Sequence, residues 1–281
     1  MKKLTSLIKK GTIVLLSGIL MVSLVNCTGG KKGAPAEETA SESKLDKEEV
    51  QKRVREVVYP LPTAFEVTEM INEIEASYII GITNETGNID KYFTDKDQAL
   101  NLGVYSADLS YASTYNMKQE IMSYMETLEN LVVELGITGA FSINFIDEVE
   151  ANINNKDKLV DLITGSFYDT YEYLVKNDKE DLSLLVLAGT WVEAMYISCN
   201  VSETVYHNPE LVTVILHQKS SLEKLMNMLK EHKEHESIQS ILADLAPIKS
   251  VYDNIDETGI TQDQLTNIIE QTNALRNKII L

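Results

Sequence analysis

The 281-residue chain is poor in the residues that interrupt helices. It contains 5 prolines and 13 glycines, and several of these fall in the first 35 residues. The remainder is rich in Leu, Glu, Lys, Ile and Met, which are good helix formers. Scarce helix breakers exclude a chain built from many tight turns and favour helix throughout.

Residue patterns of metal and nucleophile chemistry are also missing. His232 and His235 stand three apart in EHKEHES, which matches neither the HExxH nor the HxxEH spacing of zinc hydrolases. The run GGKKG (29–33) lacks the GxxxxGK[ST] spacing of a phosphate-binding loop, and no GxSxG elbow occurs. We therefore expect no metal and no cofactor, and an enzyme is the less favoured class.

Positive charge is in short supply. The chain has 43 acidic against 25 basic residues, for a formal net charge of −18. Such a charge repels phosphate backbones and anionic lipid surfaces, so we expect no nucleic-acid partner.

The N-terminus departs from this pattern. MKKLTSLIKK carries four lysines, and residues 11–25 that follow are uncharged and mostly apolar. A positive segment followed by a short apolar one is typical of a secretory signal and is short for a membrane span. A retained anchor helix is the alternative.

LVNC (24–27) closes that apolar segment and resembles the lipobox of bacterial lipoproteins. The resemblance covers residues 1–30 only, and it implies that residues 1–26 are removed and that Cys27 is acylated. Loss of four lysines and no acid would change the net charge from −18 to about −22, so membrane attachment would depend on the acyl chains. Cys199 would then have no disulfide partner and is interpreted as a small core residue.

The resemblance also implies a location. Thr28 follows the cysteine, so the acidic retention signal of some inner-membrane lipoproteins is absent and the outer membrane is favoured. GGKKG carries no acidic export tag either, which favours the periplasmic face over the cell surface.

Three segments follow from composition: the signal 1–26, a lipidated polar tether 27–44 and a helical domain 45–281. Capping residues and apolar spacing predict about nine or ten helices. We expect helices at 45–58 and 63–82, one helix that begins near 95, and another that ends at 135, before Gly136. Further helices are expected at 142–153, 157–175, 178–199, 208–235, 237–252 and from 261 to the end. NETGN (84–88) is predicted to be a loop, and Pro247 to kink or break its helix. The fold class is all-α, a helical bundle or a short helical repeat.

A faint internal similarity suggests a duplication. INEIEASYI (71–79) resembles VDLITGSFY (160–168), and GVYSADLSY (103–111) aligns with AGTWVEAMY (188–196). Two related hairpin units, about 63–135 and 155–235, would produce this similarity. Chance similarity between amphipathic helices would produce it as well.

Acidic residues among aromatic ones supply the candidate binding residues. Asp108 lies in a tyrosine-rich helix, and Glu193 interrupts a helix that is apolar nearly all round, where a carboxylate must be paired or neutral. We expect both acids on neighbouring central helices, lining one cavity with Tyr111, Trp191 and Tyr196. Alternatively, the tyrosines bury their rings and bond Asp108 in a satisfied polar core. The candidate ligand-binding residues are Tyr105, Asp108, Tyr111, Tyr115, Trp191, Glu193 and Tyr196.

These patterns favour one function over two others. The favoured function is a lipid-anchored envelope protein that binds an unidentified protein or small molecule at a groove lined by tyrosines and acids. The alternatives are an envelope hydrolase using Asp108 and Glu193, and a structural spacer. The sequence identifies no catalytic residue.

Overall fold

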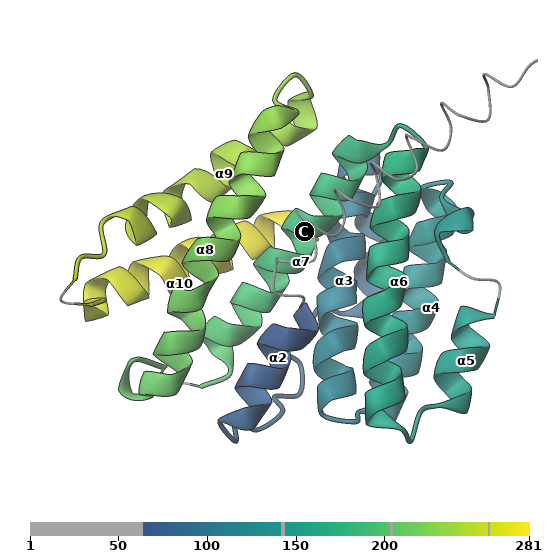
Figure 1. Cartoon of the computed structure of the whole chain (residues 1–281), viewed down its shortest axis with the longest axis horizontal. Coiled ribbons are helices and arrows are strands. Elements are labelled where there is room, and N and C mark those ends of the chain that lie inside the picture. The colour runs from purple at the N-terminus through teal and green to yellow at the C-terminus, as the bar shows by residue number, and fades with distance from the viewer. Residues whose placement is uncertain (1–63, 142–143, 203–204, 258) are drawn as a thin grey trace, which may run out of the picture. The chain divides into compact units, whose positions relative to one another are not determined.

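The structure, a computed structural model, describes residues 64–141, 144–202, 205–257 and 259–281. These residues form nine α-helices and three short 3-10 helices, with no β-strand among them (Figure 1). The predicted all-α helical bundle is confirmed. In chain order the elements are α2 (Ala64–Glu73), η2 (Thr86–Lys91), α3 (Asp95–Thr114), α4 (Lys118–Glu134), η3 (Thr138–Ala140), α5 (Phe145–Ala151), α6 (Lys156–Lys176), α7 (Glu180–Asn200), η4 (Val205–His207), α8 (Pro209–Glu231), α9 (Glu236–Asp253) and α10 (Gln262–Ile280).

The expectations for the signal segment, the tether, the helix at 45–58 and the cap at residue 63 lie outside the described residues. Within them, one helix is long and apolar enough to cross a membrane by composition, namely α7. Its apolar window is 94% buried inside the fold, which is the burial of a core helix.

Helices α3 and α7 form the centre of the fold and pack against each other more extensively than any other pair. Helices α2, α6 and α10 each contact both of them (Figure 1). Helix α4 packs against α3, and α8 and α9 pack against α7. A helix with neighbours on all sides has no polar face, which explains the nearly continuous apolar sequence of α7.

Two glycines let the central helices approach closely. A Cβ atom at Gly103 of α3 would overlap the backbone carbonyl oxygen of Val186, and one at Gly189 of α7 would overlap that of Leu100. Each glycine therefore faces the backbone of the opposite helix. This contact brings the side chains one to two turns further along α3 and α7 together.

Local capping signals place several helix ends as the sequence predicts. The Asn208 side chain accepts hydrogen bonds from the backbone N–H groups of Glu210 and Leu211, with Pro209 in the first turn of α8. Thr261 and Gln264 form the predicted capping box of α10. Gly136, two residues beyond the end of α4, has a φ of +63°.

Three local predictions differ from the structure, and the third differs only in part. The helix expected to reach Ile82 ends at Glu73, because Glu75 adopts a φ of +58° and other elements bond the following backbone. The loop expected at 84–88 lies partly in the 3-10 helix η2. Pro247 does not break its helix, because it lies inside a continuous α9, and the kink stays a prediction.

Helices α2 and α6 make corresponding contacts with the two central helices. Helix α2 contacts α3 and also α7, and helix α6 contacts α7 and also α3. Two hairpin units related by duplication would produce this pattern, in which each outer helix also contacts the central helix of the other unit. The duplication itself stays a prediction.

Candidate functional site

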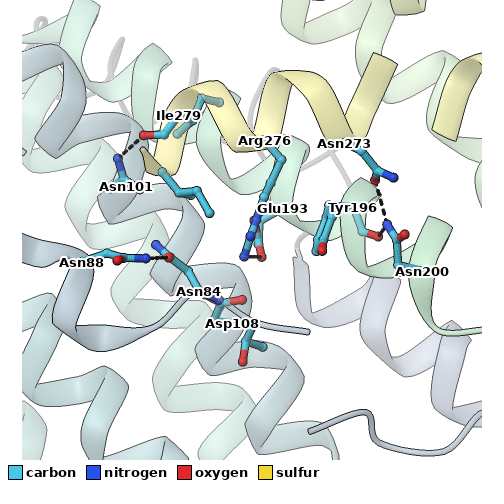
Figure 2. Close-up of polar contacts among 12 residues, drawn as sticks. Asn84, Asn88, Asn101, Asp108, Glu193, Tyr196, Asn200, Asn273, Arg276 and Ile279 are labelled. Atoms are coloured by element: carbon cyan, nitrogen blue, oxygen red, sulfur yellow. Dashed lines mark hydrogen bonds and ion pairs between the residues drawn. The ribbon is translucent and has the colours of Figure 1, made fainter. Parts of the chain in front are cut away.

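The two acids singled out in the sequence lie on adjacent helices, Asp108 on α3 and Glu193 on α7. Both side chains are fully buried, with 0% of their surface exposed. The negative charge of Glu193 acts on the Asp108 carboxyl group, and Figure 2 shows both residues below α10. A carboxylate in this environment requires a counter-charge or a proton.

Arg276 of α10 supplies the counter-charge. Its Nε lies 3.0 Å from Glu193 Oε2 and its Nη2 lies 3.1 Å from Glu193 Oε1, a bidentate pair that Figure 2 displays. The guanidinium carbon also lies 4.4 Å from the centre of the half-buried Tyr196 ring. Such a cation–π contact stabilises a desolvated guanidinium. The charges of Glu193 and Arg276 compensate each other.

For Asp108, the surroundings favour the protonated form of the carboxyl group. Burial raises the pKa of Asp108 well above its ordinary value, and the negative charge of Glu193 raises it further. Arg276 and the backbone N–H of Asn84, 3.1 Å from Oδ2, oppose the shift without reversing it. A proton on Asp108 removes the repulsion between the two acids. With Asp108 neutral, the cluster Asp108–Glu193–Arg276 carries no net charge.

The tyrosines of α3 hold the segment between α2 and η2. The Tyr105 hydroxyl donates to the Glu85 carbonyl at 2.8 Å, and the Tyr115 hydroxyl donates to the Ala76 carbonyl at 2.6 Å. The Tyr111 hydroxyl accepts from the Ile79 N–H at 3.0 Å. Burial raises the pKa of Tyr111 to about 12. A segment without regular hydrogen bonding thus obtains its partners from side chains.

Trp191 lines a different part of the structure from the two acids. It lines a cavity of about 30 Å³ together with Gln218, and neither Trp191 Nε1 nor Gln218 Nε2 has a hydrogen-bond partner among the described residues. A cavity of this size holds one or two waters, each of which can accept from such donors. The carboxyls of Asp108 and Glu193 do not line this cavity.

Other hollows formed by described residues lie at or near the surface, and the ones named next are lined by neither acid. One is a narrow apolar cavity of about 30 Å³ among α3, α4, α6 and α7. A groove of about 340 Å³ lies between α4 and α5, and another of about 390 Å³ lies between α2 and α6. Of the predicted set, the structure brings Glu193 and Tyr196 together around Arg276, places Asp108 near Glu193, and sets the Tyr111 ring edge-on to the Tyr115 ring with centres 5.0 Å apart. Ligand binding by the whole set stays a prediction.

Nucleophile and metal chemistry find little support in the part of the chain that is described. Cys199 is buried, and burial raises the pKa of its thiol, so it lacks the thiolate of a reactive cysteine. No group of three His, Cys, Asp or Glu side chains with metal-binding geometry occurs among the described residues. His232 and His235 lie beside Glu180 and Asp181 of α7.

Sequence reasoning missed Arg276, the residue that pairs Glu193. A signal was present, because Ile268, Thr272, Leu275, Arg276 and Ile279 share the buried stripe of α10. A single arginine on an apolar helix face indicates a buried acid elsewhere. The other two arginines, Arg53 and Arg55, precede the described residues.

These observations define an all-α protein whose two central helices enclose a charge-compensated polar cluster, closed by the C-terminal helix. Comparison of the chain with protein-family models, with curated proteins and with solved structures found no match.

Proposed function

We propose that the chain is a lipid-anchored protein of the cell envelope that acts as a non-enzymatic binding or interaction module. One observation supports the non-enzymatic part of this proposal: the Asp108–Glu193–Arg276 cluster is closed off from solvent. The acids best placed for proton transfer have no exposed surface and no uncompensated charge. The anchor rests on the lipobox resemblance around Cys27.

One feature of the structure favours the hydrolase alternative, and another opposes it. A protonated Asp108 beside an ionised Glu193 is an acid–base pair of the kind that glycosidases use. A substrate bond must reach both groups, however, and a tightly packed backbone crossing and α10 enclose them. The open grooves between α4 and α5 and between α2 and α6 favour surface binding over both catalysis and a plain spacer.

Catalysis is tested on envelope material. The purified chain and its Asp108→Asn variant are incubated with peptidoglycan and, separately, with phospholipid vesicles, and soluble products are quantified. We expect no release by either protein. Release by the wild-type chain that the Asp108→Asn variant loses would replace the binding module with the hydrolase.

The anchor is tested separately. The wild-type chain should fractionate with membranes of a lipoprotein-processing bacterium, and Cys27→Ser should move it to the soluble periplasmic fraction. Thr28→Ser is the matched control and should stay with the membranes. Retention of Cys27→Ser in the membrane fraction would remove the lipid anchor from the proposal.

A further inference from the structure

The groove between α4 and α5 combines an apolar floor with an acidic rim. Its floor is formed by Met125, Val132, Val133, Phe141, Phe145 and Ile146. Val133 is 57% exposed, which is unusual for a large apolar side chain. Glu129 of α4 and Asp147 of α5 stand at its edge, and both are exposed. We call this surface the α4–α5 groove.

Acidic residues predominate in the sequence that forms the α4–α5 groove. Residues 119–155 contain no lysine or arginine, and their seven acids are Glu120, Glu126, Glu129, Glu134, Asp147, Glu148 and Glu150. Two lysines contact this stretch and keep their charges: Lys118 bonds Asn154, and Lys179 donates to the Leu135 carbonyl at 3.3 Å. The seven acids outnumber these two bases, so the potential over the groove from these residues is negative.

Charge and shape together select the occupant. A volume of about 340 Å³ accommodates the apolar anchors that an amphipathic helix places at positions i, i+3, i+4 and i+7. A second copy of this chain would bring the same acids to the contact, and anionic lipid or nucleic acid would be repelled. We propose that the α4–α5 groove binds a cationic amphipathic helix, with large apolar side chains on the groove floor and lysine or arginine beside Glu129 and Asp147.

This inference rests on the proposed binding function and names its surface and partner class. The probe is a fluorescent peptide of leucine and lysine at helical spacing, about 18 residues long, so that its apolar face spans the groove. A peptide of the same composition in scrambled order has the same charge without an apolar face. The dissociation constant of each for the full chain is measured by fluorescence anisotropy.

Two variants separate apolar anchoring from charge. Val133→Gln removes the exposed apolar contact without adding charge, and Phe93→Gln is its control, because Phe93 is 85% exposed outside the groove. Glu129→Gln with Asp147→Asn removes two rim charges, and Glu231→Gln with Glu270→Gln removes two exposed charges elsewhere. Circular dichroism verifies that each variant folds.

We expect the amphipathic peptide to bind at least about tenfold more tightly than the scrambled one, and binding to weaken as salt increases. Each groove variant should weaken binding by about tenfold, whereas each control should change it by less than about twofold. Equal effects of groove and control variants would show nonspecific attraction and overturn the proposal. The hydrolysis test of the proposed function is unaffected by that outcome.

Other occupants give distinct results, and each overturns the proposal. If the peptide binds only after Lys52, Arg53 and Arg55 are all changed to Glu, then residues 45–58 of the wild-type chain occupy the groove and compete with the peptide. A dimer seen by sedimentation and lost in Val133→Gln identifies a second copy. Absence of binding to the wild-type chain and to the triple variant excludes a cationic amphipathic partner.

Discussion

The carboxylate of Glu193 on α7 is held by Arg276 on α10 through two hydrogen bonds of 3.0 and 3.1 Å, although the residues lie 83 positions apart. The pair fixes the C-terminal helix to the centre of the fold at a point where both side chains are almost completely removed from water. Asn101 adds a second tie between the same regions, because its Nδ2 donates to the Ile279 carbonyl at 2.9 Å. Docking of α10 therefore depends on polar geometry as well as on apolar burial.

Glu193→Gln should destabilise the fold strongly, although it preserves the shape of the side chain. The change leaves the Arg276 cation buried without a counter-charge, which costs about 3–5 kcal/mol in comparable buried pairs. The free energy of unfolding is measured by urea denaturation. Asp244→Asn is the matched control, since Asp244 pairs with a Lys278 side chain that is 60% exposed, and an exposed pair contributes less than about 1 kcal/mol.

Similar losses in Glu193→Gln and Asp244→Asn would contradict the prediction. A double variant, Glu193→Gln with Arg276→Met, removes both the anion and the buried cation. It should be more stable than Glu193→Gln alone, because no unpaired charge is left.

Asp108→Asn should behave in the opposite way and raise stability at neutral pH. The raised pKa of Asp108 means that the folded chain keeps a proton that the unfolded chain loses above about pH 3.9. The unfolded state thus binds fewer protons, and stability falls as pH rises, by at most about 1.4 kcal/mol per pH unit, until the folded pKa is passed. Asparagine keeps the shape of the side chain and can accept from the Asn84 N–H without this cost.

Urea denaturation of the wild-type chain and Asp108→Asn across pH 3 to about pH 8 measures the effect. The difference in unfolding free energy should be small at the acidic end and should grow in favour of the variant as pH rises. A constant difference, or one that favours the wild-type chain at neutral pH, would mean that Asp108 is ionised in the fold.

The sequence predicted the class and most helix positions because those depend on local signals. Asn208 with Pro209, and Thr261 with Gln264, act within a few residues, and the structure uses both as caps. The unbroken apolar sequence of α7 likewise indicated its central place without further information. Local signals of this kind do not depend on which helices later become neighbours.

The predictions that failed concern segments whose structure depends on contacts with residues distant in the sequence. Helical spacing continues past Glu73, yet the backbone at Ala76, Ile79 and Asn84 is bonded by Tyr115, Tyr111 and Asp108 of another helix. Those partners are invisible in a local window. The same holds for Arg276, whose stripe on α10 was readable but whose pairing with Glu193 required the fold.

Tyr105→Phe and Tyr115→Phe should loosen the segment from Ala76 to Glu85 without unfolding the protein. Each removes one hydroxyl that satisfies a backbone carbonyl, a loss of about 0.5–1.5 kcal/mol. Hydrogen exchange should accelerate at amides of 76–85 more than in α9. Tyr206→Phe is the control, because Tyr206 is 41% exposed. Faster exchange throughout the chain, or none, would contradict a local role.

The crossing of α3 and α7 provides the sharpest test of the packing at the centre. Gly103→Ala should destabilise the fold by about 1–3 kcal/mol or more, because the added methyl group meets the backbone of Val186 and Thr190, which no rotamer change can move aside. Gly165→Ala in the interior of α6 is the matched control, since no atom lies within 4 Å of the added Cβ. There the substitution should stabilise by about 0.5–1 kcal/mol, through the higher helix propensity of alanine. Thermal and urea unfolding of both variants decide the matter. If Gly103→Ala were as stable as Gly165→Ala, α3 and α7 would have to lie further apart, and Asp108 would no longer lie near Glu193.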